Sequence, residues 1–279
     1  MYQMMSLPLY SGTFQEYDSW RDLGQELERL GCDGIEGVWG GEDLPKDLPA
    51  ELILGYHLIF YPDWLDFYRD DRAALKQKFG SLEAVASFYG GLGPDTLLEQ
   101  YRADLRRAVN LGARYVVFHV SDVSLEEGYT YRWLHTNQEV IDAAVEVVNL
   151  ILGEERWPFE FLVENQWWPG FTFTEPEETA RLLEGIRFAG KGILLDTGHL
   201  MNACTELKTE AEGADYIRSM LNRHGSLAKW VRGVHLHQSL SGAYVKAHTG
   251  SLPAGLPEDY MERFGVSYQH ILQIDQHRP

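Results

Sequence analysis

The stretch FEFLVENQ, residues 159–166, joins a short run of bulky apolar residues to three polar ones. A short run that is apolar on both faces is typical of a strand in a buried parallel sheet. The polar end, Glu164, Asn165 and Gln166, falls where this strand is expected to stop. Active sites of parallel α/β proteins gather at the carboxyl ends of strands, so the stretch predicts a fold class and the location of a site.

Similar apolar runs recur along the whole chain. The other six are residues 4–9, 34–38, 53–60, 115–120, 192–195 and 231–236. Segments with apolar residues at spacings of three and four lie between several of them, which predicts helices over 17–30, 96–111, 137–152 and 175–186. Alternating strands and helices favour right-handed βα units and therefore a parallel sheet.

The length of 279 residues suits one α/β barrel and is also compatible with two small domains. We interpret residues 1–279 as a single (β/α) TIM-type barrel domain, with a helical or loop insertion at 61–93 and a long loop at 239–260. Seven strands are counted where a complete barrel has eight, and no eighth strand is evident before Pro279. A strand missed by the pattern, an incomplete barrel and a truncated chain all remain open.

Composition narrows the class of partner and the cellular location. The net charge of −18 disfavours nucleic acid without excluding it, because duplex binders neutralise phosphates with Lys and Arg. Cys32 and Cys204 form no CxxC pair, which predicts no disulfide framework and favours the cytoplasm. Residues 1–10 lack the pattern of a signal peptide, and no run is long enough to cross a membrane.

Side chains that commonly bind metals follow several of the predicted strands. They are His57, His119, Asp122, Glu164, Asp196, His199, His235 and His237, with Asp275 and His277 near the C-terminus. Each alone is more often a structural group, but in a barrel these strand ends converge. Buried carboxylates are costly without a compensating cation, so the set predicts a divalent metal site. Mixed carboxylate and imidazole ligands suit Zn, Mn, Co or Mg.

Taken in order, the motifs DGIEGV, LVENQ, LLDTGH and VRGVHLH resemble the xylose isomerase-like (β/α)-barrel superfamily. That superfamily holds sugar and sugar-phosphate isomerases and epimerases, and also zinc-dependent apurinic-site endonucleases. The resemblance implies that Glu164, Asp196 and His235 are metal ligands. It also implies a fourth ligand, a Glu on the eighth strand, which the sequence does not contain before its end.

The resemblance implies further roles for the remaining histidines. His199 matches a position that contacts substrate in the isomerases and binds a metal in the endonucleases. His237 falls where many family members have a basic residue that binds substrate. The remaining candidate ligands resemble the extra ligands with which endonuclease-type members hold two or three zinc ions; they are His57, His119, Asp275 and His277.

These observations lead to two enzyme hypotheses and one alternative without catalysis. The preferred one is a metal-dependent isomerase or epimerase of a sugar-like small molecule, in which Glu164 also transfers a proton and Trp168 packs against the substrate. The second is a multinuclear zinc phosphoesterase resembling apurinic-site endonucleases. A relative that kept the fold but lost turnover is the third. The sequence leaves the substrate, the metal and a homo-oligomer open.

Overall fold

The computed structural model describes residues 1–44 and 47–278. Its single sheet has seven parallel strands in the order β1 to β7. Six of the seven predicted strands match to within two residues at each end, and the third stops three residues earlier than predicted. The strands are β1 (Met4–Leu9), β2 (Gly34–Trp39), β3 (Ile53–His57), β4 (Tyr115–His119), β5 (Glu160–Glu164), β6 (Lys191–Asp196) and β7 (Val231–His235).

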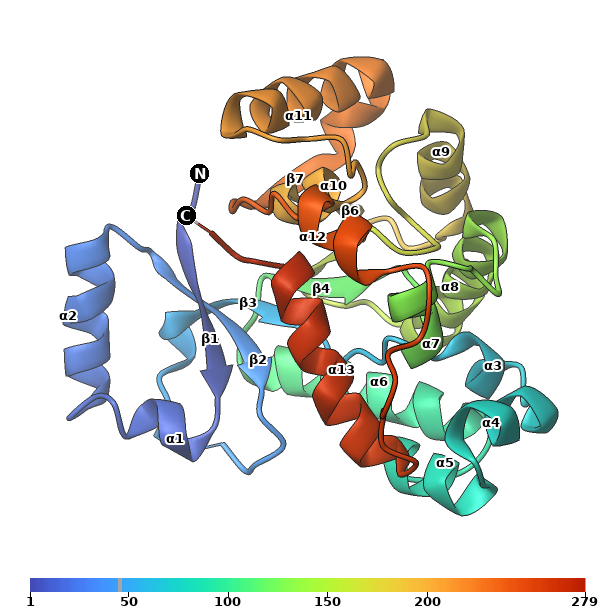
Figure 1. Ribbon diagram of the computed structural model, residues 1–279. Coiled ribbons are helices and arrows are strands. Elements are labelled where there is room, and N and C mark those ends of the chain that lie inside the picture. The colour runs from blue at the N-terminus through green and yellow to red at the C-terminus, as the bar shows by residue number, and fades with distance from the viewer. Residues whose placement is uncertain (45–46, 279) are drawn as a thin grey trace.

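Helices connect the strands, and most lie outside the sheet (Figure 1). The four predicted helices correspond to α2 (Trp20–Leu30), α6 (Pro94–Asn110), α8 (Asn137–Leu152) and α9 (Pro176–Gly185). The stretch predicted as an insertion holds α3 (Leu65–Tyr68), α4 (Arg72–Phe79) and α5 (Leu82–Tyr89). The others are α1 (Ser11–Phe14), η1 (Ala50–Leu52), α7 (Leu125–Thr130), α10 (Thr197–Asn202), α11 (Glu210–His224), η2 (Gly225–Trp230), α12 (Gly242–His248) and α13 (Tyr260–Ile274).

One prediction from sequence was wrong. Residues 239–260 are not a continuous loop, because α12 occupies 242–248 and is followed by α13, which crosses the molecule in Figure 1. Gly242 begins this seven-residue helix, and a stretch rich in glycine and proline follows it, which hides the short apolar period of the helix. In the described part of the chain no helix is long and apolar enough to cross a bilayer, and both cysteines are free.

The sheet curls into a TIM-type half-barrel, and its two faces differ in what they bury. On the outer face, Phe118, Phe161 and Ile193 belong to the large core shared with the helices. On the inner face, Val117, Leu162 and Leu194 form a small apolar cluster. Successive side chains alternate between the two faces, so the residue two positions after each inner one also points into the curl.

A tight loop after β5 depends on one glycine. Gly170 has φ +131°, and a Cβ there would lie 2.3 Å from the backbone oxygen of Val120. We expect Gly170→Ala to lower the free energy of unfolding by at least about 2 kcal/mol, from backbone strain and overpacking. Urea denaturation measures this, with Gly24→Ala as the control because a Cβ at that position in α2 meets nothing within 4 Å. Equal stabilities of the two variants would contradict the expectation.

Candidate metal centre

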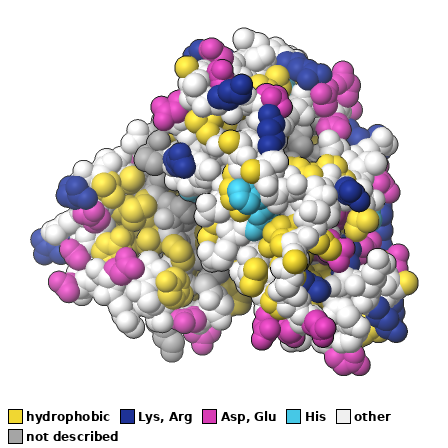
Figure 2. Space-filling model, in the orientation of Figure 1, with side chains coloured by type: hydrophobic (Ala, Val, Ile, Leu, Met, Phe, Trp, Pro, Cys, Tyr) yellow, Lys and Arg dark blue, Asp and Glu magenta, His cyan; other side chains and the backbone are white. Residues whose placement is uncertain are grey.

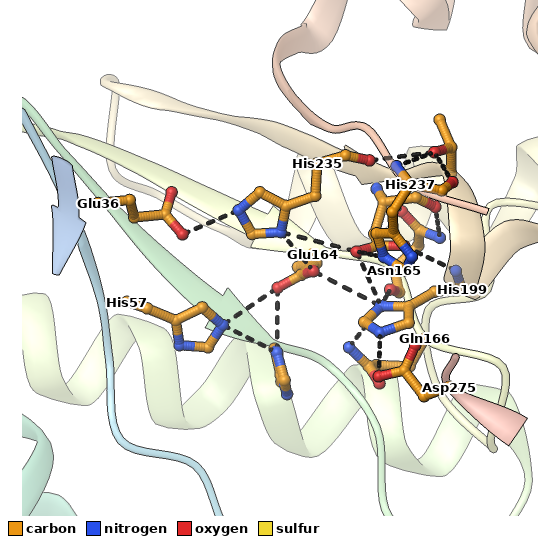
Figure 3. A network of polar contacts seen from close by, with 12 residues as sticks. Glu36, His57, Glu164, Asn165, Gln166, His199, His235, His237 and Asp275 are labelled. Carbon is orange, nitrogen blue, oxygen red and sulfur yellow. Dashed lines mark hydrogen bonds and ion pairs between the residues drawn. The ribbon is translucent and has the colours of Figure 1, made fainter. Parts of the chain in front are cut away.

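The alternation of side chains places a layer of polar residues directly above the apolar inner layer. His119, Glu164 and Asp196 each lie two residues beyond a member of the apolar cluster, on β4, β5 and β6. The strand register puts His119 beside Glu164 and Asp196 beside His235. His57 ends β3 in the same way. The predicted ligands from five strands therefore converge inside the curl, as Figure 3 shows for most of them.

Glu164 lies at the middle of this layer and is 1% exposed. Its Oε2 atom is 3.3 Å from Nε2 of His57 and 3.0 Å from Nε2 of His119. Its Oε1 atom is 3.0 Å from Nδ1 of His235 and 3.5 Å from Nδ1 of His199. The two oxygens of one carboxylate thus face different sets of histidines (Figure 3).

His235 has partners on both ring nitrogens. Nδ1 faces Glu164 and lies 3.7 Å from Oδ2 of Asp196, whereas Nε2 lies 2.9 Å from Oε1 of Glu36. Glu36, on β2, is 4% exposed and also accepts a hydrogen bond of 2.6 Å from the hydroxyl of Tyr115. This is the arrangement in which a carboxylate fixes the orientation of a metal-binding histidine through its other nitrogen.

The C-terminal segment brings a further set of donors to the same end of the sheet. Oδ2 of Asp275 is 3.5 Å from Nε2 of His199 and 2.8 Å from Nε2 of His277. His237 stacks on His277, with ring centroids 4.1 Å apart and an angle of 4° between the ring planes. Its Nε2 atom is 2.8 Å from Oδ2 of Asp196.

Three groups of side chains in the described residues have donor atoms within 4.8 Å of one another and could hold a metal ion. We call them the first, second and third groups. The first is His57, His119 and Glu164; the second is Glu164, Asp196 and His235; the third is His199, His237, Asp275 and His277. The structure therefore brings together all seven predicted ligands, and with them the predicted substrate contacts His199 and His237.

The charges of these residues suit a cation. Burial disfavours a charged Glu164, but His235 and His119 outweigh it and hold the pKa of the carboxyl well below its usual range. Burial also opposes the charged forms of Asp196 and His199, yet their neighbours lower the pKa of Asp196 to about 2 and raise that of His199 to about 9. The buried carboxylates are thus anionic near neutral pH, and protonated histidines compensate them. A divalent ion can take over that compensation by displacing protons from the imidazoles, so the donor set fits a metal.

Some residues that the sequence singled out lie elsewhere. Asp122 accepts hydrogen bonds from the backbone N–H groups of Trp64 and Leu65, outside the three groups. Trp168 packs on Trp167, and it is Trp167 whose ring contacts His199, with centroids 4.9 Å apart. The part that Glu36 plays beside His235 was not predicted. A buried acid at the centre of GIEGV was the available signal.

Comparison with known proteins gives the family. A model of the family described as xylose isomerase-like TIM barrel matches residues 25–272. No curated protein matches the sequence.

Solved structures resemble the chain at low identity. Endonuclease IV from Thermus thermophilus is 17% identical, with 98% of this chain and 87% of that one covered and a TM-score of 0.44. The 3-keto-D-glucoside 4-epimerase from E. coli is 12% identical, with 99% of this chain and 89% of that one covered and a TM-score of 0.48. Mannonate dehydratase from Streptococcus suis serotype 2 is 13% identical, with 100% of this chain and 96% of that one covered and a TM-score of 0.48. The assignment rests on the family model and on the seven parallel strands: the chain belongs to the xylose isomerase-like TIM barrel family.

Proposed function

We propose that the protein is a metal-dependent hydrolase of phosphoester bonds in a small, sugar-like substrate. The observation that carries this proposal is the position of Glu164. One of its oxygens faces His57 and His119, and the other faces His235. A carboxylate with donors on both sides is the usual bridge of a two-ion site, and such sites serve displacement at phosphorus.

In this proposal the first and second groups form the catalytic site. Divalent ions bound there would supply positive charge to the phosphate oxygens and activate a water molecule. The protein's own residues orient the site. Glu36 holds the ring of His235 through a hydrogen bond of 2.9 Å. Asn165 fixes the backbone at Asp196 with hydrogen bonds of 2.8 and 3.0 Å. Burial of Glu164 and Asp196 keeps bulk water away from the ligands.

The electrostatics of the chain favour a small substrate over a nucleic acid. The net charge is −18, which opposes the approach of a polyanion. Figure 2 shows histidine side chains in the middle of one face, bordered mostly by hydrophobic and uncharged atoms, with many Asp and Glu toward the rim. A single phosphate group on a small molecule meets less long-range repulsion than a duplex does.

An isomerase or epimerase of a sugar is the second candidate, and the second group favours it. Glu164, Asp196 and His235 alone could hold one ion, which suffices to stabilise an enediolate while a carboxylate such as Glu164 moves a proton. The family to which the chain belongs also carries the name of an isomerase. The predicted substrate contacts of His199, His237 and Trp168 remain predictions under either candidate.

The number of ions bound by the full chain and its reaction products separate the two functions. Protein saturated with Zn²⁺, Mn²⁺ or Co²⁺ would be dialysed, analysed for metal, and assayed with bis(4-nitrophenyl) phosphate, sugar phosphates and an abasic duplex. We expect two or more ions per chain and release of nitrophenol or phosphate. Ketoses and aldoses in deuterated water form the other arm. One ion per chain, with deuterium entering a sugar carbon and no phosphoester cleavage, would replace the hydrolase with the isomerase.

A further inference from the structure

Asp122 is the one member of the predicted ligand set that the metal centre leaves unused. Within the described part of the chain, every other acid or histidine of that set belongs to one of the three groups. Asp122 lies three positions after His119, and its side chain has no exposed surface. Burial raises the pKa of Asp122, and Lys78 and two backbone N–H groups oppose that rise. A buried carboxylate is costly unless hydrogen bonds compensate it, so its partners indicate what it does.

The carboxylate joins the connection after β4 to the connection after β3. Its Oδ1 atom accepts hydrogen bonds of 2.8 and 2.9 Å from the backbone N–H groups of Trp64 and Leu65, at the start of α3. The N-cap residue of α3 is Trp64, whose side chain makes no capping hydrogen bond. Asp63, the acid next to it, contacts Lys78 at 2.6 Å instead. A residue from another strand end therefore supplies the acceptor that a helix usually takes from its own N-cap residue.

The backbone around Asp122 joins the same connection to a third one, after β5. The N–H group of Asp122 donates to the carbonyl of Pro169 over 2.9 Å, and Ser121 forms an isolated antiparallel bridge with Gly170. On the opposite side, the indole N–H of Trp64 donates to the carbonyl of Ser121 over 2.6 Å. Residues 120–123 are therefore hydrogen-bonded to the connections on both sides of them.

The three connections directly follow the strands that carry the ligands of the first group. His57 ends β3, His119 ends β4 and Glu164 ends β5. The side chains of His57 and Glu164 point toward each other in Figure 3. A metal site tolerates errors of only about 0.2 Å in its distances to ligands, so the backbone that leaves each strand must be held firmly. The spacing of the first group thus depends on how the three connections are joined.

We propose that Asp122 is a positioning residue that fixes the spacing of His57, His119 and Glu164 through its Oδ1 atom and its own backbone. This inference rests on the proposed function, in which the first group holds one of the catalytic ions. Asp122 acts through the backbone, because it belongs to none of the ligand groups. The second group is fixed differently, since Asn165 holds the backbone at Asp196. Loss of the Asp122 carboxylate should therefore weaken one ion and leave the other.

The test compares two substitutions that differ in the acceptor they leave. Asp122→Asn keeps an oxygen for the N–H groups of Trp64 and Leu65, whereas Asp122→Ala removes it. Chelator competition measures the affinity of the full-length protein for each Zn²⁺ ion. We expect Asp122→Ala to weaken one ion by about 10- to 100-fold, as for other residues that orient metal ligands. Asp122→Asn should bind that ion nearly as tightly as the unchanged protein does.

The affected ion is assigned with a double-mutant cycle. His119→Asn removes a ligand from the first group alone, so adding Asp122→Ala to it should cause no further loss at the remaining site. Glu126→Ala, at an exposed position of α7, is the control. Both substitutions of Asp122 also remove the charge near Lys78. A loss of stability in urea that the two share is thereby separated from a loss of affinity in the alanine variant alone.

Trp64→Phe provides a second readout if Asp122→Ala does not fold. It removes the indole N–H that donates to Ser121 and keeps an aromatic ring. The affinity for the same ion should fall by about two- to tenfold, the effect expected of one hydrogen bond.

Three results would overturn the proposal. The first is a folded Asp122→Ala protein, or a Trp64→Phe protein in its place, that binds both ions as tightly as the unchanged chain. The second is equal weakening in Asp122→Asn and Asp122→Ala, which would assign the effect to charge rather than to hydrogen bonding. The third is equal weakening of both ions, which would indicate general loosening of the fold. Cleavage of bis(4-nitrophenyl) phosphate is assayed separately, and its absence would refute the hydrolase while the ion affinities still test Asp122.

Discussion

Replacing Glu164 with glutamine is expected to empty the first and second groups together and to reduce turnover by about a thousandfold or more. Both groups contain this residue. The substitution keeps the size of the side chain and removes the negative charge that faces His57, His119 and His235. A neutral amide cannot compensate two divalent ions, so the loss should appear in metal content before any assay of activity.

Metal analysis of the dialysed variant and a thermal melt of its metal-free form provide the check. The matched control is Glu160→Gln, an exposed residue at the start of the same strand, which should keep its ions and its turnover. A Glu164→Gln protein that retains every ion would show that the ligand assignment is wrong. If the Glu164→Gln protein loses its ions and also fails to fold, Asp196→Asn is tested in its place, because this substitution removes a charge from the second group alone.

Much of this site could be predicted because strand parity is simple. In a parallel sheet the side chains at the carboxyl ends lie at one edge, and every second residue points to the same face. That rule is enough to bring His119, Glu164 and Asp196 together once the strands are located. The strands themselves are marked by continuous apolar runs, and the main helices by their period.

Other features depended on contacts that no local pattern contains. Glu36 lies one strand away from the predicted ligands, and its contact with His235 arises only because the sheet curls until β2 faces β7. Asp122 follows β4 just as His119 ends it, yet its carboxylate turns outward to accept backbone N–H groups at the start of α3. Which of Trp167 and Trp168 contacts His199 depended on the conformation of the loop after β5, which a local sequence pattern does not reveal.

A separate set of buried charged residues, outside the metal centre, helps to hold the segment with α3, α4 and α5 in place. Nζ of Lys78, in α4, lies 2.6 Å from Oδ1 of Asp63 and 2.8 Å from Oδ2 of Asp66. Asp122 is also buried nearby, and His135 lies 3.2 Å from Asp66. Burial raises the pKa of Asp63 to about 7, even though Lys78 opposes the rise. Lys78 is therefore the main cation among three carboxylates.

We expect Lys78→Met to lower the free energy of unfolding by about 3–5 kcal/mol at pH 8, because removing one partner leaves buried carboxylates uncompensated. The loss should be smaller at pH 6. Asp63 has a folded pKa above its unfolded value, so the folded state binds more protons than the unfolded state between pH 4 and 7. Its contribution to stability is therefore lost as pH rises through 7, and removal of Lys78 raises the pKa further. Asp66, whose pKa is lowered to about 2, titrates below this range.

Urea denaturation at pH 6 and pH 8 measures both effects, with Lys76→Met as the control on an exposed position of the same helix. The control should change stability by less than about 0.5 kcal/mol at either pH. A Lys78→Met protein that is equally destabilised at both values would mean that the lysine acts through packing of its alkyl chain, since packing does not depend on protonation. A Lys78→Met protein as stable as the control would mean that water, rather than the ammonium group, compensates the three carboxylates.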